Sequence, residues 1–179
     1  VRRGAGVDAI DRVLRGSRLP DLGPVARARE TNLKLAILTC MDARIDAAGI
    51  LGLQPPDAHI VRNAGGRVTD DAIRSIALSQ AVLGTREVMV IHHTDCALGR
   101  MTQAEIAARV EAATGHRFAA DAGSFADPAK AVTDDLERLR NHPHIAHRDK
   151  IRGFIYDLVA GTLTEVAAPT GDPPGAVTE

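Results

Sequence analysis

The sequence contains very few aromatic residues: its 179 positions include no tryptophan, one tyrosine and three phenylalanines. Aromatic side chains form the platforms on which nucleic-acid bases stack, so this scarcity disfavours a base-stacking surface and a large aromatic ligand pocket. The charges also nearly cancel, with 22 basic residues, 23 acidic residues and a net charge of -1. Proteins that bind nucleic acid normally carry a basic surface, and we therefore expect no nucleic-acid partner.

Cysteine and long apolar runs are also scarce. Two cysteines are too few for a disulfide-stabilised scaffold, and no apolar run approaches the roughly 18 residues that indicate a membrane-spanning helix. The chain begins at Val1 and shows no secretory signal. These absences predict no membrane partner and a cytoplasmic location.

The middle of the chain alternates between two patterns. Short apolar runs predict strands, and stretches with helical spacing that follow capping residues predict helices. The predicted strands cover 33–39, 58–62, 87–92, 153–158 and 163–166, and the predicted helices cover 69–84, 102–113 and 127–142. Strands that alternate with helices build a mostly parallel sheet covered on both faces. The prediction is an α/β fold with three layers, α/β/α, and an antiparallel edge strand from the last strand pair.

The two ends differ from this middle part. Residues 1–30 are rich in arginine and contain one amphipathic helical stretch that stops near Gly16, which predicts a helical arm. Residues 31–168 form the α/β domain. Residues 169–179 are rich in proline, glycine and threonine, which predicts a disordered tail.

Three metal-ligating side chains follow two of the predicted strands. Cys40 comes directly after the first strand, and His93 and Cys96 come directly after the third. Parallel strands place their carboxyl ends at one edge of a sheet, where α/β proteins hold their ligands. Two thiolates and one imidazole suit tetrahedral zinc, and three protein ligands leave a fourth position for water, as in catalytic zinc sites.

The spacing of these three residues is about equally consistent with side chains that bind no metal. Free cysteines are often buried as small apolar side chains, and a loop histidine is often only hydrogen-bonded. A disulfide between Cys40 and Cys96 is a third alternative, which a reducing compartment disfavours.

Two charged residues beside Cys40 favour the zinc interpretation. Alternate residues of an extended segment share one side, so Asp42 and Arg44 are expected to face the same way as Cys40. Arg44 can hold Asp42 by a bidentate ion pair. Asp42 can then accept a hydrogen bond from water at the metal, or it can occupy the fourth position itself. An ordinary surface ion pair is the alternative.

Three motifs occur in order: Cys40-x-Asp42-x-Arg44, then Arg62-Asn63-Ala64-Gly65-Gly66, then His93-x-x-Cys96. This ordered set resembles the β-class carbonic anhydrases, and the likeness extends from about residue 33 to residue 99. The strings Cys-Met-Asp-Ala-Arg and His-His-Thr-Asp-Cys are most similar to the short bacterial, mycobacterial-type branch. Carbonyl sulfide hydrolases are close relatives of that branch.

The resemblance implies a zinc-dependent lyase that reversibly hydrates carbon dioxide to bicarbonate and a proton. Cys40, His93 and Cys96 match the zinc ligands of the family, and Asp42 and Arg44 match its catalytic pair. In the open state of such a site Asp42 pairs with Arg44, whereas in the closed state Asp42 is the fourth zinc ligand. The resemblance also implies a homodimer or an assembly of dimers, in which residues 1–30 contact a partner subunit.

The substrate cleft is expected to lie beside the second motif. Paired glycines let the backbone approach a site closely and can present amide donors to an anion. The residues expected to line the cleft are Asn63, Ala64, Gly65 and Gly66. A small aliphatic pocket around Ala64, Val68 and Leu98 is predicted to receive carbon dioxide.

Some family features are missing, and two functional alternatives stay open. Ala97 replaces the glycine that many members have after the second cysteine, and the chain has no tryptophan for the inhibitory bicarbonate site of some members. One alternative is hydrolysis of carbonyl sulfide or carbon disulfide at the same zinc site. The other is a non-catalytic zinc-binding protein in which Asp42 permanently closes the site.

Two further residues near the third motif each allow two interpretations. His92 is the nearest candidate for carrying a proton from the site to buffer, because the pKa of histidine is near 6.5, but it can equally be a packed or hydrogen-bonded residue at the end of its strand. Asp95 either supports the site or faces solvent.

Overall fold

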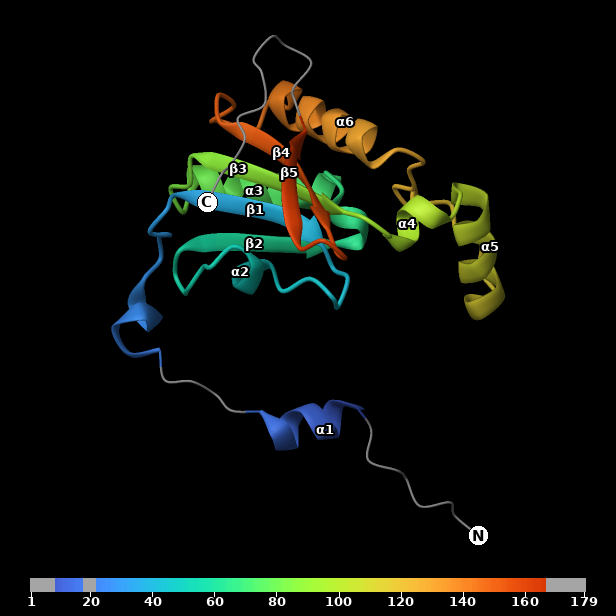
Figure 1. Cartoon of the computed structure of the whole chain (residues 1–179), viewed down its shortest axis with the longest axis horizontal. Coiled ribbons are helices and arrows are strands. Elements are labelled where there is room, and N and C mark those ends of the chain that lie inside the picture. The colour runs from blue at the N-terminus through green and yellow to red at the C-terminus, as the bar shows by residue number, and fades with distance from the viewer. Residues whose placement is uncertain (1–8, 18–21, 167–179) are drawn as a thin grey trace.

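The centre of the molecule is a five-stranded sheet in the order β2-β1-β3-β4-β5 (Figure 1). The structure, a computed structural model, describes residues 9–17 and 22–166. The strands are β1 (Leu35–Cys40), β2 (Ala58–Asn63), β3 (Glu87–His93), β4 (Ile151–Asp157) and β5 (Thr162–Val166). Neighbouring strands from β2 to β4 run parallel, and β5 pairs antiparallel with β4. The predicted α/β fold with an antiparallel edge strand is confirmed.

Helices connect the strands, and two of the longer ones pack on one face of the sheet. Within the described residues they are α1 (Ala9–Gly16), α2 (Ala47–Ile50), α3 (Asp70–Ala81), α4 (Ala97–Arg100), α5 (Gln103–Thr114) and α6 (Pro128–Asn141), with 3-10 turns η1 (Gly23–Arg27) and η2 (Ala64–Gly66). The predicted caps form, since Thr69 accepts a hydrogen bond from the amide of Ala72, and Thr102 and Glu105 make a capping box. The sequence does not predict α2 and α4, because four residues are too few to show helical periodicity.

Two apolar clusters hold the surrounding segments on the sheet. On one face, Leu38 of β1 and Val90 of β3 pack with residues of α3 and α6. On the other face, Ile37 and Ile91 pack with Leu53, which follows α2. Successive residues of a strand point to opposite faces. Both faces of β1 and β3 are therefore buried, which explains why these strands are apolar almost throughout.

Gly153 of β4 lies where α6 packs closely on the sheet. A Cβ added there would lie 2.3 Å from Val132 Cγ1 and 2.9 Å from Leu136 Cδ1. Both side chains are almost fully buried and have little room to move. We expect Gly153→Ala to lower the free energy of unfolding by about 1–3 kcal/mol through overpacking, as measured by urea denaturation. Gly16→Ala is the control, because a Cβ at Gly16 meets nothing within 4 Å. An equal loss in both variants would contradict the packing explanation.

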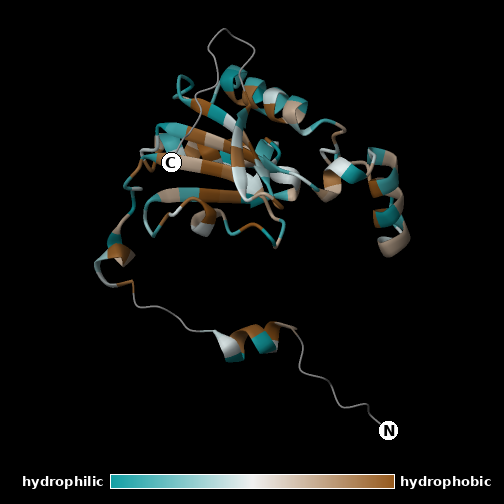
Figure 2. Ribbon diagram, in the orientation of Figure 1, coloured by the Kyte–Doolittle hydropathy of each residue, from teal (hydrophilic) through white to brown (hydrophobic). Residues whose placement is uncertain are grey.

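The described part of the predicted arm contains α1, whose apolar side chains face solvent. Ile10, Val13 and Leu14 are 70%, 68% and 66% exposed, and Figure 2 shows the hydrophobic colour on α1 as well as along the strands. Residues 1–8 and 18–21 of the arm and the predicted tail at 169–179 lie outside the described residues. The division at residues 30 and 168 stays a prediction. No helix in the described ranges is long and apolar enough to cross a membrane.

Candidate metal centre and active site

The three predicted metal ligands converge at the carboxyl edge of the parallel strands. Cys40 is the last residue of β1, His93 is the last residue of β3, and Cys96 directly precedes α4. Because β1 and β3 are neighbours in the sheet, their ends meet. The two sulfur atoms and a ring nitrogen of His93 lie within 4.8 Å of one another, and all three residues are buried. Their donor types and spacing suit a zinc ion.

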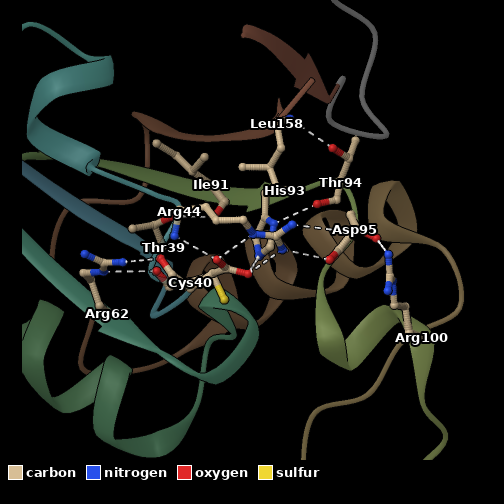
Figure 3. A network of polar contacts seen from close by, with 11 residues as sticks. Thr39, Cys40, Arg44, Arg62, Ile91, His93, Thr94, Asp95, Arg100 and Leu158 are labelled. Atoms are coloured by element: carbon tan, nitrogen blue, oxygen red, sulfur yellow. Dashed lines mark hydrogen bonds and ion pairs between the residues drawn. The ribbon is translucent and has the colours of Figure 1, made fainter. Parts of the chain in front are cut away.

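His93 is oriented for a metal by its own loop. Its Nδ1 lies 2.8 Å from the carbonyl oxygen of Thr94 (Figure 3). A carbonyl oxygen only accepts, so Nδ1 carries the proton and Nε2 presents a lone pair. Within the described part of the chain, this buried Nε2 has no hydrogen-bond partner. Metal-ligating histidines are held in this way, with one ring nitrogen donating to an acceptor and the other facing the metal. The residues therefore fit zinc.

The thiols of Cys40 and Cys96 lie close enough to affect each other's ionisation. Their interaction lowers the pKa of the Cys40 thiol to about 4, against the opposing effect of burial. The same interaction, together with burial, raises the pKa of the Cys96 thiol. Backbone amides, including those of Gly65 at Cys40 and Leu98 at Cys96, act to lower both pKa values. Both cysteines are free thiols, and a thiolate is the form that binds a metal.

Gly65 and Gly66 bring η2 against the end of β1. Their φ angles are 74° and 67°, in the left-handed region that residues with a Cβ rarely adopt. A Cβ at Gly66 would lie 2.9 Å from the backbone nitrogen of Cys40 and 3.1 Å from the carbonyl oxygen of Ile91. The paired glycines therefore permit the close backbone approach that the sequence predicts, and they place an amide donor at Cys40.

The other residues predicted around the substrate differ in their burial and in the cluster with which they pack. Ala64 is exposed, whereas Asn63 is partly buried and donates from Nδ2 to the carbonyl of Arg67 over 2.7 Å. Leu98 packs in one cluster with the two cysteines. Val68 instead packs in the main core cluster with residues of α3 and α6, because the chain turns toward α3 after η2. The aliphatic pocket around Ala64, Val68 and Leu98 stays a prediction.

Asp42 and Arg44 form the predicted bidentate ion pair. Arg44 donates from Nε to Asp42 Oδ1 over 2.9 Å and from Nη2 to Oδ2 over 2.7 Å, and its backbone amide donates to Oδ1 over 3.0 Å. The hydrogen bonds from Arg44 hold the pKa of Asp42 well below its ordinary value. Asp42 Oδ2 lies 4.0 Å from Nε2 of His93. The carboxylate thus lies beside the metal ligands while Arg44 holds it, as expected for the open state.

Arg62 supports this pair from the neighbouring strand, a role that the sequence does not predict. It donates from Nε to the carbonyl of Cys40 over 3.1 Å and from Nη2 to the carbonyl of Asp42 over 2.7 Å (Figure 3). Arg62 therefore anchors the backbone of Cys40 and of Asp42. Its place at the start of the second motif is the one sequence signal for it.

Asp95 lies on the opposite side of Arg44 from Asp42. Its Oδ2 accepts from Arg44 Nη1 over 3.0 Å, and its other carboxylate oxygen pairs with Arg100 (Figure 3). Of the two roles predicted for Asp95, the structure supports contact with the site. Arg100 has no signal in the sequence, because its partner is decided by how α4 follows the loop.

His92 is a packed residue rather than a proton carrier. It is fully buried, its Nε2 lies 3.0 Å from Asp135 Oδ2 of α6, and its ring stacks on Phe125 at 5.5 Å between centroids. Arg67 also donates to Asp135, over 2.8 Å. A side chain without exposed surface has no contact with buffer, so the predicted proton-carrying role is wrong and the packing alternative holds.

Comparison with protein families agrees with this geometry. A family model described as carbonic anhydrase matches residues 35–163, which is most of the chain. Beta-carbonic anhydrase 1 of Mycobacterium tuberculosis is 41% identical over 132 residues, which cover 74% of this chain and 81% of the relative. The chain belongs to the β-class carbonic anhydrase family. The resemblance to the mycobacterial-type branch is thereby confirmed.

The chain is also similar to a carbonic anhydrase of known structure and to a carbon disulfide hydrolase. The crystal structure of carbonic anhydrase from Streptococcus mutans is 39% identical, with a TM-score of 0.75 over 87% of this chain and 91% of the other. Carbon disulfide hydrolase of an Acidianus species is 37% identical over 152 residues, which cover 71% of this chain and 74% of the relative. The three-ligand centre of this β-class carbonic anhydrase is a candidate zinc site.

Proposed function

We propose that this protein is a zinc-dependent lyase that reversibly hydrates carbon dioxide to bicarbonate and a proton. One observation carries the proposal: Asp42 Oδ2 lies 4.0 Å from Nε2 of His93, yet both of its oxygens are engaged by Arg44. A carboxylate held in this way is not available as a fourth ligand, so that position stays open to water. The identity to Beta-carbonic anhydrase 1 of Mycobacterium tuberculosis supports the same reaction.

The roles follow from the donor types. Cys40, His93 and Cys96 hold Zn²⁺ in this proposal. When bound, zinc lowers the pKa of water from 15.7 to about 7 and so supplies hydroxide near neutral pH. Asp42 would accept a hydrogen bond from the O–H of the attacking oxygen, which would orient the oxygen lone pair toward carbon dioxide. Arg44 keeps Asp42 ionised and in place.

The substrate is apolar, and the proposed cleft has apolar and backbone walls. Leu98, which packs with the two cysteines, forms the apolar wall. The backbone wall is the run Asn63, Ala64, Gly65 and Gly66, in which Gly65 lies directly beside Leu98. Such a cleft excludes bulk water while it admits a small apolar molecule.

Stopped-flow hydration of carbon dioxide by zinc-loaded protein tests the proposal. We expect turnover well above the buffer rate at neutral pH, and faster turnover in mildly alkaline buffer. Because carbon disulfide hydrolases are among the relatives, release of hydrogen sulfide from carbon disulfide and from carbonyl sulfide is measured in parallel. Hydrogen sulfide release without hydration would assign the sulfur substrates instead. Bound zinc without turnover of any substrate would favour a non-catalytic protein.

The ionisation of Asp42 gives a prediction about pH. Its pKa in the folded chain lies below the unfolded value of about 3.9, so the ion pair stabilises the folded chain above that pH and loses its contribution as the pH falls. We expect a carboxyl-carbon NMR titration to find Asp42 ionised down to acidity well below pH 4, and Arg44→Gln to return its pKa toward about 3.9. An ordinary pKa for Asp42 in the unmodified protein would show that Arg44 does not hold it in solution.

We further propose a homodimer or an assembly of dimers, located in the cytoplasm. The exposed apolar residues Ile10, Val13 and Leu14 of α1 support association, because a partner subunit would bury them. Two thiols that must stay reduced to bind zinc support a reducing compartment. Analytical ultracentrifugation is expected to show a dimer or larger species, and removal of residues 1–30 is expected to weaken it. A monomer at micromolar concentration would contradict the association.

A further inference from the structure

Asp95 occupies the loop that joins two of the metal ligands, His93 and Cys96. Its backbone has a φ of 60°, in the left-handed region that aspartate tolerates better than most residues. This conformation turns two acceptors toward Arg44. Arg44 Nη1 donates to the Asp95 carboxylate over 3.0 Å, and Arg44 Nη2 donates to the Asp95 carbonyl over 3.2 Å (Figure 3).

Arg44 is therefore held from two sides. Its Nε and Nη2 face Asp42, whereas Nη1 faces Asp95. The guanidinium group is planar and its donors are fixed relative to one another, so a contact on one edge fixes the direction of the other edge. The Arg44 side chain is 50% exposed and the Asp95 side chain is 40% exposed. An ion pair this exposed adds little to folding stability, so its main effect is on orientation.

We propose that Asp95 is a positioning residue, which fixes the plane of the Arg44 guanidinium so that Arg44 keeps Asp42 away from the metal ligands. The inference rests on the proposed function, in which Asp42 acts while paired with Arg44. Without Asp95, Arg44 rotates more freely and holds Asp42 less firmly. Asp42 Oδ2 lies only 4.0 Å from Nε2 of His93, so a released carboxylate reaches the ligand position and closes the site to water.

Two substitutions of Asp95 and one matched control test the proposal. Asp95→Ala removes the carboxylate. Asp95→Asn keeps an acceptor oxygen for Arg44 and tolerates the left-handed backbone. Asp157→Asn is the control, because Asp157 ends β4 at the same edge of the sheet and its carboxylate accepts from the backbone amides of Val159 and Ala160. The three variants are compared with the unmodified protein in zinc content, kcat and KM.

The expected values of zinc content, kcat and KM distinguish a role of Asp95 in orienting Arg44 from a role in folding. We expect Asp95→Ala to retain zinc and KM while kcat falls roughly threefold to tenfold, the size expected for one exposed charge-assisted contact. Asp95→Asn is expected to recover most of kcat, and Asp157→Asn to match the unmodified protein. A kcat of Asp95→Ala within twofold of the unmodified value would overturn the proposal. Loss of zinc in step with activity would also overturn it, because Asp95 would then support the loop rather than Arg44.

A spectroscopic measurement makes the test independent of turnover. Co²⁺ replaces zinc, and its visible absorption bands depend on the ligand set and geometry. We expect the bands of Asp95→Ala to differ from those of the unmodified protein, and the difference to disappear when both proteins also carry Asp42→Ala. Unchanged bands in Asp95→Ala, or a difference that persists without Asp42, would overturn the proposal. If the unmodified protein hydrates no carbon dioxide, the proposed function fails, and the cobalt bands still decide whether Asp95 restrains Asp42.

Discussion

Cys40→Ser is expected to lose zinc and carbon dioxide hydration together. Cys40 supplies one of only three protein ligands in the candidate centre, and a serine hydroxyl binds zinc far less well than a thiolate. Without the metal, the pKa of water returns from about 7 to 15.7, so we expect activity to fall by about three orders of magnitude or more. Zinc per chain is measured by elemental analysis after dialysis, and hydration is measured by stopped flow.

Two histidine variants, one at a candidate ligand and one at an exposed position, provide a matched control for this experiment. His93→Ala is expected to behave like Cys40→Ser, because His93 is the third residue of the candidate metal centre. His144→Ala removes an exposed histidine in the loop after α6 and is expected to keep both zinc and activity. Full zinc content in either ligand variant would show that the ion binds elsewhere. Activity without zinc would remove the metal from the proposed function.

Asp42→Asn is expected to keep zinc and lose most turnover. Asparagine has the size of aspartate, but its neutral amide is a weaker acceptor and no longer forms an ion pair with Arg44. A positioned group that handles a proton in the transition state contributes about 10²–10⁴ in rate, so we expect kcat to fall by about a hundredfold, or roughly 2.7 kcal/mol of barrier. Zinc content and kcat are measured on the same preparation.

A neighbouring aspartate serves as the control for this charge removal. Asp46 lies four residues further along the same loop, and its side chain caps α2 by accepting from the amide of Gly49. Asparagine is also a good cap, so Asp46→Asn is expected to keep kcat within about twofold. Full activity in Asp42→Asn would show that the pair with Arg44 is an ordinary surface ion pair without a part in turnover.

The strands of the sheet and the metal ligands can be predicted from the sequence alone. β1 and β3 are predicted because their apolar residues form short uninterrupted runs, and the ligands are predicted because they follow those runs directly. The three ordered motifs are similar to those of one family, and the family comparison confirms it. These features depend on local composition and on the general rule that parallel strands end at one edge, so no knowledge of long-range contacts is needed.

The side chains that support the site are selected by the tertiary structure. Arg44 and Asp95 are 51 positions apart in the chain and meet only because β1 and β3 are adjacent in the sheet. His92 is paired with Asp135 of α6, and Val68 is packed with the core helices, for the same kind of reason. A side chain's partners depend on the register and crossing of elements that are distant in sequence. Periodicity and motif spacing carry no information about those distances, so the ligands can be found in the sequence while the residues that orient them cannot.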